Sequence, residues 1–141
     1  MSRWSDRAGR TGLAAPLGLT LDDTGTVPWL VDLVADGPHA LIAGTTGAGK
    51  SELLRALVVG LSLTTPPDEL AIVLVDYKGG ATFDALTGLP HVVGVVTDLD
   101  DHLADRMLRS LTAEVRRREQ VLRSAGVADL RLLGCRRDRQ P

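Results

Sequence analysis

The sequence has little cysteine, few lysines, no long apolar run and no excess of positive charge. A single cysteine, Cys135, excludes a disulfide within the chain and is typical of a reducing cytosol. The longest apolar run lies around Ala56 to Leu61, far short of the roughly 20 residues of a membrane span. The first seven residues, MSRWSDR, hold no apolar core, so we expect neither a secretion signal nor a span here. The net charge of −2 gives no overall positive field that would attract nucleic acid.

The shortage of lysine is informative because arginine is abundant. Only two basic residues are lysine, Lys50 and Lys78. In a chain that otherwise uses arginine, a lysine suggests a site that needs a compact ammonium group instead of a planar guanidinium. Lys50 lies in the motif described next. Lys78 is a second candidate, with an ordinary solvated lysine as the alternative.

The most specific pattern in the chain is GTTGAGKS, which fits G-x-x-x-x-G-K-[ST] at every required position. The apolar residues 39–43 before it predict a short buried strand, and residues 52–63 after it predict a helix. Strand, loop and helix in this order are the context of a phosphate-binding loop; a glycine-rich turn that caps a helix is the alternative. The predicted nucleotide-binding residues are Gly44, Thr45, Thr46, Gly47, Ala48, Gly49, Lys50 and Ser51.

The residue types in this loop suit a polyphosphate. Gly44, Gly47 and Gly49 permit tight or positive-φ turns and a close approach of the backbone to phosphate oxygens. The N–H groups and the positive end of the following helix then face an anion. We expect Lys50 to reach the β- and γ-phosphates of ATP and the Ser51 hydroxyl to bind Mg²⁺.

The rest of the chain predicts alternating strands and helices. A β-hairpin is expected around the turn at 22–25, and residues after Ser51 predict a mostly parallel sheet flanked by helices. The expected elements are strands 17–21, 29–34, 70–75 and 91–96, a short helix at 81–86, and an amphipathic helix at 101–124 closed by Gly126.

Two further polar clusters follow predicted strands, and ligands in such sheets gather at the carboxyl ends of strands. Asp76, in DYKGG, resembles by pattern an aspartate of a metal shell; capping the next element or pairing with Lys78 is the alternative. Asp98 and Asp100, in TDLD, are expected to cap the long helix. Contact of Asp98 with nucleotide, metal or another subunit is the alternative.

Three consecutive arginines, Arg116 to Arg118, lie in the long helix between Glu114 and Glu119. One interpretation is a solvated face with local ion pairs. The other is a contact with another subunit or with nucleic acid.

These motifs together resemble the FtsK/SpoIIIE family of P-loop motors. The resemblance rests on PHALIAGTTGAGKSELLRAL, VLVDYKGGATF and LPHVVGVVTDLDDHLADRMLRSLTAEVRRRE and covers about Pro16 to Asp129. Within the family, the motifs DYKGG and VTDLD are most similar to those of the EccC-type ATPases of type VII secretion. The chain is therefore expected to divide into a flexible lead-in at 1–15, a partial ATPase domain at 16–130 and a divergent tail at 131–141.

The resemblance implies an additional-strand, RecA/FtsK-like P-loop ATPase core in the α/β class. It also implies ATP and Mg²⁺ as ligands and a hexameric ring in full-length relatives. The cargo is a secreted protein in one branch and double-stranded DNA in another. The expected location is cytoplasmic, with membrane association through other segments or partners left open.

In relatives, the chain segment after the long helix continues into an apolar strand. That strand ends in Asp-Glu, the Walker B pair. Here residues 131–141 carry no such strand, so the chain resembles the front part of a motor domain. No catalytic residue is assigned, and ATP hydrolysis by this chain is left open beside nucleotide binding without turnover. Because an incomplete parallel sheet leaves an edge unpaired, we expect marginal stability or association.

Overall fold

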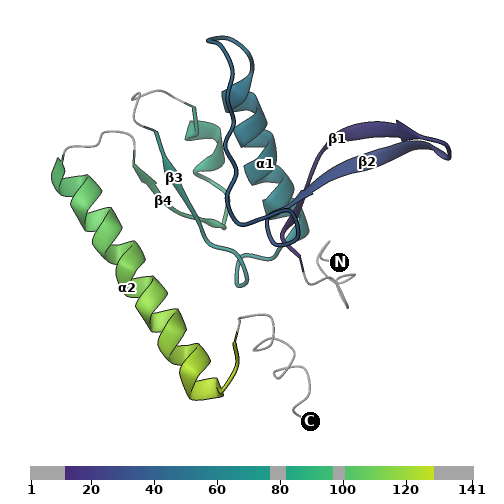
Figure 1. Ribbon diagram of the computed structural model, residues 1–141. Helices are drawn as coiled ribbons and strands as arrows, with labels where there is room; N and C mark the ends of the chain where they lie inside the picture. The colour runs from purple at the N-terminus through teal and green to yellow at the C-terminus, as the bar shows by residue number, and fades with distance from the viewer. Residues whose placement is uncertain (1–11, 77–81, 97–100, 129–141) are drawn as a thin grey trace. The chain divides into compact units, whose positions relative to one another are not determined.

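The structure is a computed structural model that describes residues 12–76, 82–96 and 101–128. These residues belong to two compact units, one ending at Asp98 and the other beginning at Leu99. Figure 1 labels the helices and strands. In chain order they are β1 (Ala14–Asp22), β2 (Gly25–Asp32), α1 (Lys50–Thr64), β3 (Ile72–Val75), the 3₁₀ helix η1 (Asp84–Leu86), β4 (Val92–Val96) and α2 (Asp101–Ala125).

The predicted β-hairpin is confirmed. Strands β1 and β2 pair antiparallel from Ala14 opposite Asp32 to Asp22 opposite Gly25. At the turn, Asp22 Oδ1 accepts hydrogen bonds from the Thr24 N–H at 2.7 Å and the Thr24 hydroxyl at 2.6 Å. Gly25 has a φ of 121°, which glycine adopts without steric cost. The turn chemistry of these few residues is therefore sufficient to set the hairpin.

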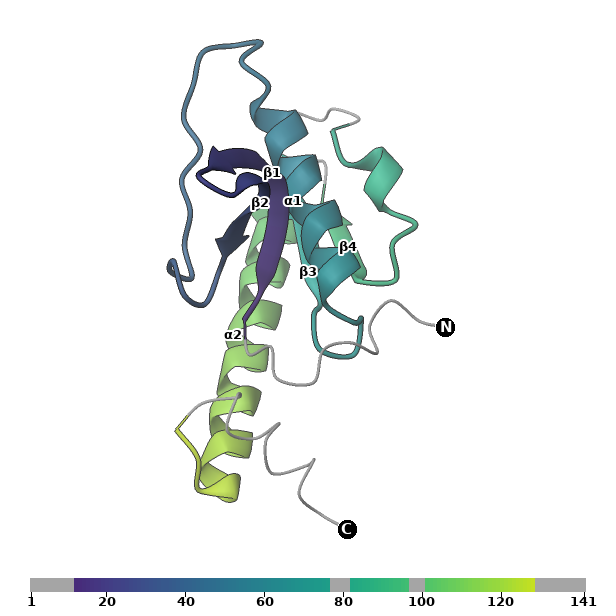
Figure 2. The ribbon, with the colours of Figure 1, turned by 90° about the vertical axis from the view of Figure 1, so that its right-hand side faces the viewer.

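The first residues of the hairpin pack against helix α1. Gly60 lies so close to β1 that an added Cβ would be 3.1 Å from Ala15 Cβ and 3.2 Å from the Pro16 carbonyl oxygen. Ala15 is fully buried in this contact. The Thr64 hydroxyl donates a hydrogen bond to the Ala14 carbonyl at 2.7 Å. Figure 2 shows the start of β1 running alongside α1.

The predicted parallel strands are also confirmed. Strands β3 and β4 pair in parallel, from Ile72 beside Val92 to Val75 beside Val96. One face of this pair packs against α1 and η1 and forms the core of the first unit. The buried residues of this core are Val58, Leu74, Phe83 and Leu86.

One prediction within the first unit is wrong. Residues 39–43 form no strand, and Leu41 is 94% exposed. A strand needs a neighbour for its backbone hydrogen bonds, and the described residues supply none beside this segment.

The predicted sheet therefore takes a different form. The described residues contain an antiparallel pair and a parallel pair, and no strand joins them into one sheet. The fold class expected from the sequence is confirmed in its α/β composition and its strand-to-helix order. The larger, mostly parallel sheet is not formed by these residues.

Helix α2 forms the second unit and runs one residue beyond its predicted end. Gly126, with a φ of 62°, follows the helix. Its N–H donates to the Arg123 carbonyl at 3.1 Å, and the Val127 N–H donates to the Leu122 carbonyl at 3.1 Å. This pair of bonds is a Schellman motif, which satisfies carbonyl groups at a helix end. Within the described part of the chain, no helix is long and apolar enough to cross a membrane.

Candidate functional site

The phosphate-binding pattern forms a loop whose backbone turns at two glycines. Gly47 and Gly49 have φ values of 80° and 83°, in the region that glycine favours. Between them, the Ala48 N–H donates a hydrogen bond to the Thr45 carbonyl at 3.2 Å. Gly44 does not need a positive φ; its role is close packing, since an added Cβ would lie 3.3 Å from Ala48 Cβ. The loop thus curves back on itself.

The Lys50 ammonium lies inside this curve. Its Nζ donates hydrogen bonds to the Gly44 carbonyl at 2.9 Å and the Thr45 carbonyl at 2.6 Å. The Lys50 side chain also passes the start of the loop, because its Cγ and Cδ lie 3.8 Å from the position of a Gly44 Cβ. The single positive charge of this segment is therefore held by the loop itself.

Helix α1 begins at the loop and directs its N-terminus toward it. The residue before the helix is Gly49, in the left-handed conformation and with no side chain to cap the helix. The Leu53 N–H donates to the Gly49 carbonyl at 2.9 Å, which closes the first turn. The earlier N–H groups of a helix have no partner within it, and the helix dipole places partial positive charge there. Ser51 is exposed in this first turn.

Asp76 lies at the carboxyl end of β3. Its N–H donates to the Val96 carbonyl at 2.9 Å, so it extends the pairing of β3 with β4. Its side chain is half-buried, with Oδ2 shielded from solvent. Because parallel strands end at the same edge of a sheet, the segments after β3 and β4 both start from this edge. The candidates Lys78 and Asp98, and the predicted cap Asp100, lie outside the described residues.

One contact of helix α1 was not predicted from the sequence. Arg55 Nε donates a hydrogen bond to the Thr82 carbonyl, and Arg55 Nη1 pairs with Glu52 Oε1 at 2.5 Å. These contacts join the first two turns of α1 to the segment that follows β3. The spacing of Glu52 and Arg55 indicates an ion pair on one helix face, but no local signal points to Thr82.

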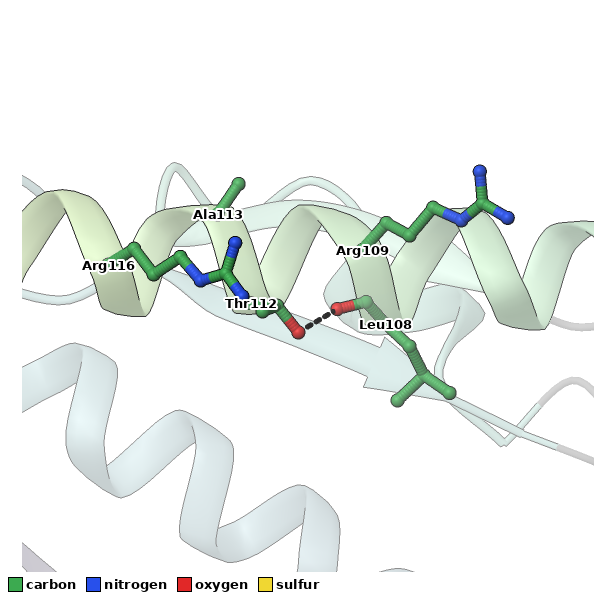
Figure 3. Close-up of a pocket in the computed structure, with 5 residues that line it drawn as sticks. All are labelled: Leu108, Arg109, Thr112, Ala113 and Arg116. Carbon is green, nitrogen blue, oxygen red and sulfur yellow. Dashed lines mark hydrogen bonds between the residues drawn. The ribbon is translucent and has the colours of Figure 1, made fainter.

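The described residues contain no group of three or more His, Cys, Asp and Glu side chains that could hold a metal ion. A shallow surface hollow lies on α2, in the second unit. Figure 3 shows its lining: Leu108, Arg109, Thr112, Ala113 and Arg116. This hollow has none of the backbone geometry of the loop at 44–51.

Comparison with known proteins places these features in a family. A sequence model of the FtsK/SpoIIIE family matches residues 14–139. The ESX-5 secretion system protein EccC5 of Mycobacterium tuberculosis is 42% identical over 137 residues, covering 91% of this chain and 10% of the relative. The type VII secretion system protein EssC of Staphylococcus aureus is 38% identical, covering 86% of this chain and 8% of the relative. The chain spans about a tenth of the length of these curated relatives.

Two solved structures are similar to the chain. The cytoplasmic domain of the Thermomonospora curvata type VII secretion ATPase EccC matches with a TM-score of 0.81 and 43% sequence identity. This match covers 98% of the present chain and 17% of that chain. ATPases 2 and 3 of the same EccC, in complex with a signal sequence peptide, match with a TM-score of 0.77 and 32% identity, over 92% of this chain and 24% of that one.

Proposed function

The chain belongs to the FtsK/SpoIIIE family, and its relatives are EccC-type ATPases of type VII secretion; from this premise we propose that it binds Mg-ATP over residues 44–51. The observation that supports the proposal most is the Lys50 ammonium held inside a loop with two positive-φ glycines. Such a loop presents backbone N–H groups and one cation to the same small space.

The phosphates would replace the carbonyl groups as partners of Lys50. In the loop the ammonium donates to two neutral carbonyl oxygens, of Gly44 and Thr45. Phosphate oxygens carry negative charge and form stronger, charge-assisted hydrogen bonds with an ammonium group. The N–H groups at Gly47, Gly49 and the start of α1 would bind the remaining phosphate oxygens. Lys50 would then lie against the β- and γ-phosphates.

Mg²⁺ would be bound by Ser51 and the phosphates, with Asp76 as a second candidate. Mg²⁺ takes one or two protein ligands in such sites and keeps several waters, so no larger cluster of acidic side chains is required. The exposed Ser51 hydroxyl follows Lys50 directly in the first turn of α1. Lys78 and Asp98 remain predicted contributors outside the described residues.

We propose that the full-length proteins of this family hydrolyse the ATP bound at this loop. Water attacks the γ-phosphorus, the bond to the bridging oxygen breaks, and ADP and inorganic phosphate leave. Catalysis of this reaction is largely positioning and charge stabilisation. The part contributed by this chain is to bind the phosphates and the metal. Nucleotide binding without turnover is the second candidate, and a phosphate-release assay distinguishes the two.

The cargo that we propose is a secreted protein. One structural neighbour is an EccC in complex with a signal sequence peptide, and the net charge of −2 does not favour DNA contact by this chain. We propose a cytoplasmic location, because the other structural neighbour is the cytoplasmic domain of an EccC. Assembly into a ring of copies, and translocation of double-stranded DNA as the alternative activity, stay predictions. Salt-dependent DNA binding by the full-length protein would favour the latter.

Calorimetry with Mg-ATP tests the nucleotide site. The 141-residue chain should bind Mg-ATP with an affinity that Lys50→Ala abolishes. Asp68→Ala, an exposed acidic residue outside the loop, serves as the matched control and should bind like the unaltered chain. Micromolar binding retained in Lys50→Ala would overturn the site. Phosphate release that Lys50→Ala abolishes would exclude binding without turnover.

A further inference from the structure

Glu52 stands at a position of helix α1 where a carboxylate often bonds the helix start. It is the third residue of the helix, and Gly49 is the residue that precedes the helix. A glutamate at this position commonly folds back and accepts a hydrogen bond from the N–H group of the preceding residue. Negative charge is also favourable near a helix N-terminus. A carboxylate turned back in this way would occupy N–H groups that the proposed phosphate site needs.

In the structure the Glu52 carboxylate is bound elsewhere. Its Oε1 accepts a hydrogen bond from Arg55 Nη1 at 2.5 Å. The spacing of three residues places these two side chains on one face of the helix. The Glu52 side chain is 71% exposed, so the contact with Arg55, and not burial, fixes its direction. The carboxylate is thereby directed away from the N–H groups at the start of α1, which have no partner within the helix.

Arg55 is able to hold this carboxylate because its guanidinium is fixed at a second point. Arg55 Nε donates a hydrogen bond to the Thr82 carbonyl, in the segment that follows β3. The next residue, Phe83, is buried in the same core cluster as Val58 of α1. A planar guanidinium offers donors in fixed directions, so one side chain bonds the carbonyl and the carboxylate together. The folded core therefore sets the position of Arg55, and Glu52 follows it.

We propose that Arg55 is a positioning residue of the nucleotide site, which keeps the Glu52 carboxylate away from the N–H groups that bind phosphate. This inference rests on the proposed function of the loop at 44–51. Without Arg55, the carboxylate turns back to the start of α1 and competes with the phosphates as an internal anion. Because this competitor belongs to the same helix turn, it acts at a high effective concentration. Arg55 acts through Glu52 and does not need to touch the nucleotide.

Amide NMR of the nucleotide-free chain tests the direction of Glu52. In Arg55→Met, one or more amide proton resonances from Gly49 to Ser51 should move downfield, because the carboxylate bonds the helix start. Adding Glu52→Ala to Arg55→Met should return them to their positions in the unaltered chain. Arg117→Met is the matched control, because it breaks the similar pair with Glu114 on α2, and it should leave these amides unmoved. Amides that stay in place in Arg55→Met would overturn the proposal.

Calorimetry with Mg-ATP measures the effect on binding. Arg55→Met should weaken binding about fivefold, the size expected for a carboxylate at a helix N-terminus. Glu52→Ala alone should not weaken binding, and the double variant should recover the affinity of the unaltered chain. A loss of packing around Arg55 would persist in the double variant. An affinity that Glu52→Ala does not restore would therefore contradict a positioning role.

The two measurements separate this inference from the proposed function. If the unaltered chain binds no Mg-ATP, the proposed function fails and this inference fails with it. If the unaltered chain binds but Arg55→Met changes neither the amides nor the affinity, only the inference fails. The Arg55 side chain is 34% exposed, so circular dichroism checks the fold of each variant. Should Arg55→Met lose its helical signal, Arg55→Gln takes its place in both measurements, because glutamine removes the charge and keeps an N–H donor for the Thr82 carbonyl.

Discussion

The Thr64 hydroxyl donates a hydrogen bond to the Ala14 carbonyl across 50 positions of the chain, at 2.7 Å. It thereby joins the end of α1, the helix that follows the loop at 44–51, to the first residue of the hairpin. The same hydroxyl lies within 3.0 Å of the Gly60 carbonyl, its own helix backbone. Replacing it should therefore affect mainly the attachment of the hairpin.

Thr64→Val should lower the free energy of unfolding by about 1 kcal/mol, the usual net contribution of one hydrogen bond. Valine keeps the shape of threonine and removes the hydroxyl. Urea unfolding gives the value. Thr112→Val is the matched control, because that exposed hydroxyl bonds only its own helix and its loss should be close to neutral. Equal effects of the two changes would contradict a role for Thr64 in attachment.

His91→Ala should be more damaging, by about 2–3 kcal/mol, because it removes a buried ring and a buried hydrogen bond together. His91 is 2% exposed, and its Nε2 lies 2.7 Å from the Thr65 carbonyl. This contact links the end of α1 to the residue before β4. The control is His39→Ala at an exposed position. Similar unfolding midpoints for the two variants would show that His91 is not a structural residue.

Glu114 should titrate at an unusually low pH. Hydrogen bonds from Arg117 and then Arg118 lower the pKa of its carboxyl from 4.5 to about 2. The folded-state pKa is lower than the unfolded one, so this stabilisation is complete above pH 4.5 and is lost as pH falls through about 2. Carbon-13 NMR of the Glu114 carboxyl checks the midpoint. A midpoint near 4.5, or one that Arg117→Gln leaves unmoved, would contradict the pairing.

Gly49→Ala should weaken Mg-ATP binding about tenfold. Its φ of 83° forces a Cβ into a conformation that costs an L residue roughly 1–2 kcal/mol, and 1.4 kcal/mol is a factor of ten. Calorimetry measures the affinity. Gly88→Ala is the control, because a Cβ there meets nothing within 4 Å. An unchanged affinity in Gly49→Ala would mean that this turn is not part of the nucleotide site.

Local chemistry explains which parts of the fold the sequence could predict. The turn at Asp22 to Gly25, the helix after Gly49 and the helix stop at Gly126 depend on residues within a few positions. Each of these predictions is confirmed by the structure. The positive φ at Gly47 and Gly49 follows likewise from the glycine spacing of the loop.

Features that depend on distant residues were missed. Residues 39–43 are apolar enough for a buried strand, yet a strand forms only beside another, and Leu41 stays exposed. The contact of Arg55 with Thr82 joins positions 27 apart, and no pattern in either segment indicates it. The residue types of the motif predicted the candidate nucleotide site. Only the structure shows that the Lys50 ammonium points back to the carbonyl groups of Gly44 and Thr45.

The most direct measurement is residue-resolved NMR of the loop amides during a titration with Mg-ADP. If the backbone at 44–51 binds the phosphates, the amide resonances of Gly47, Gly49 and Lys50 should shift strongly and saturate together. The amide resonance of Asp23, in the turn between β1 and β2, should not shift. Loop amides that do not move at saturating nucleotide, or shifts confined to other segments, would contradict the proposed site.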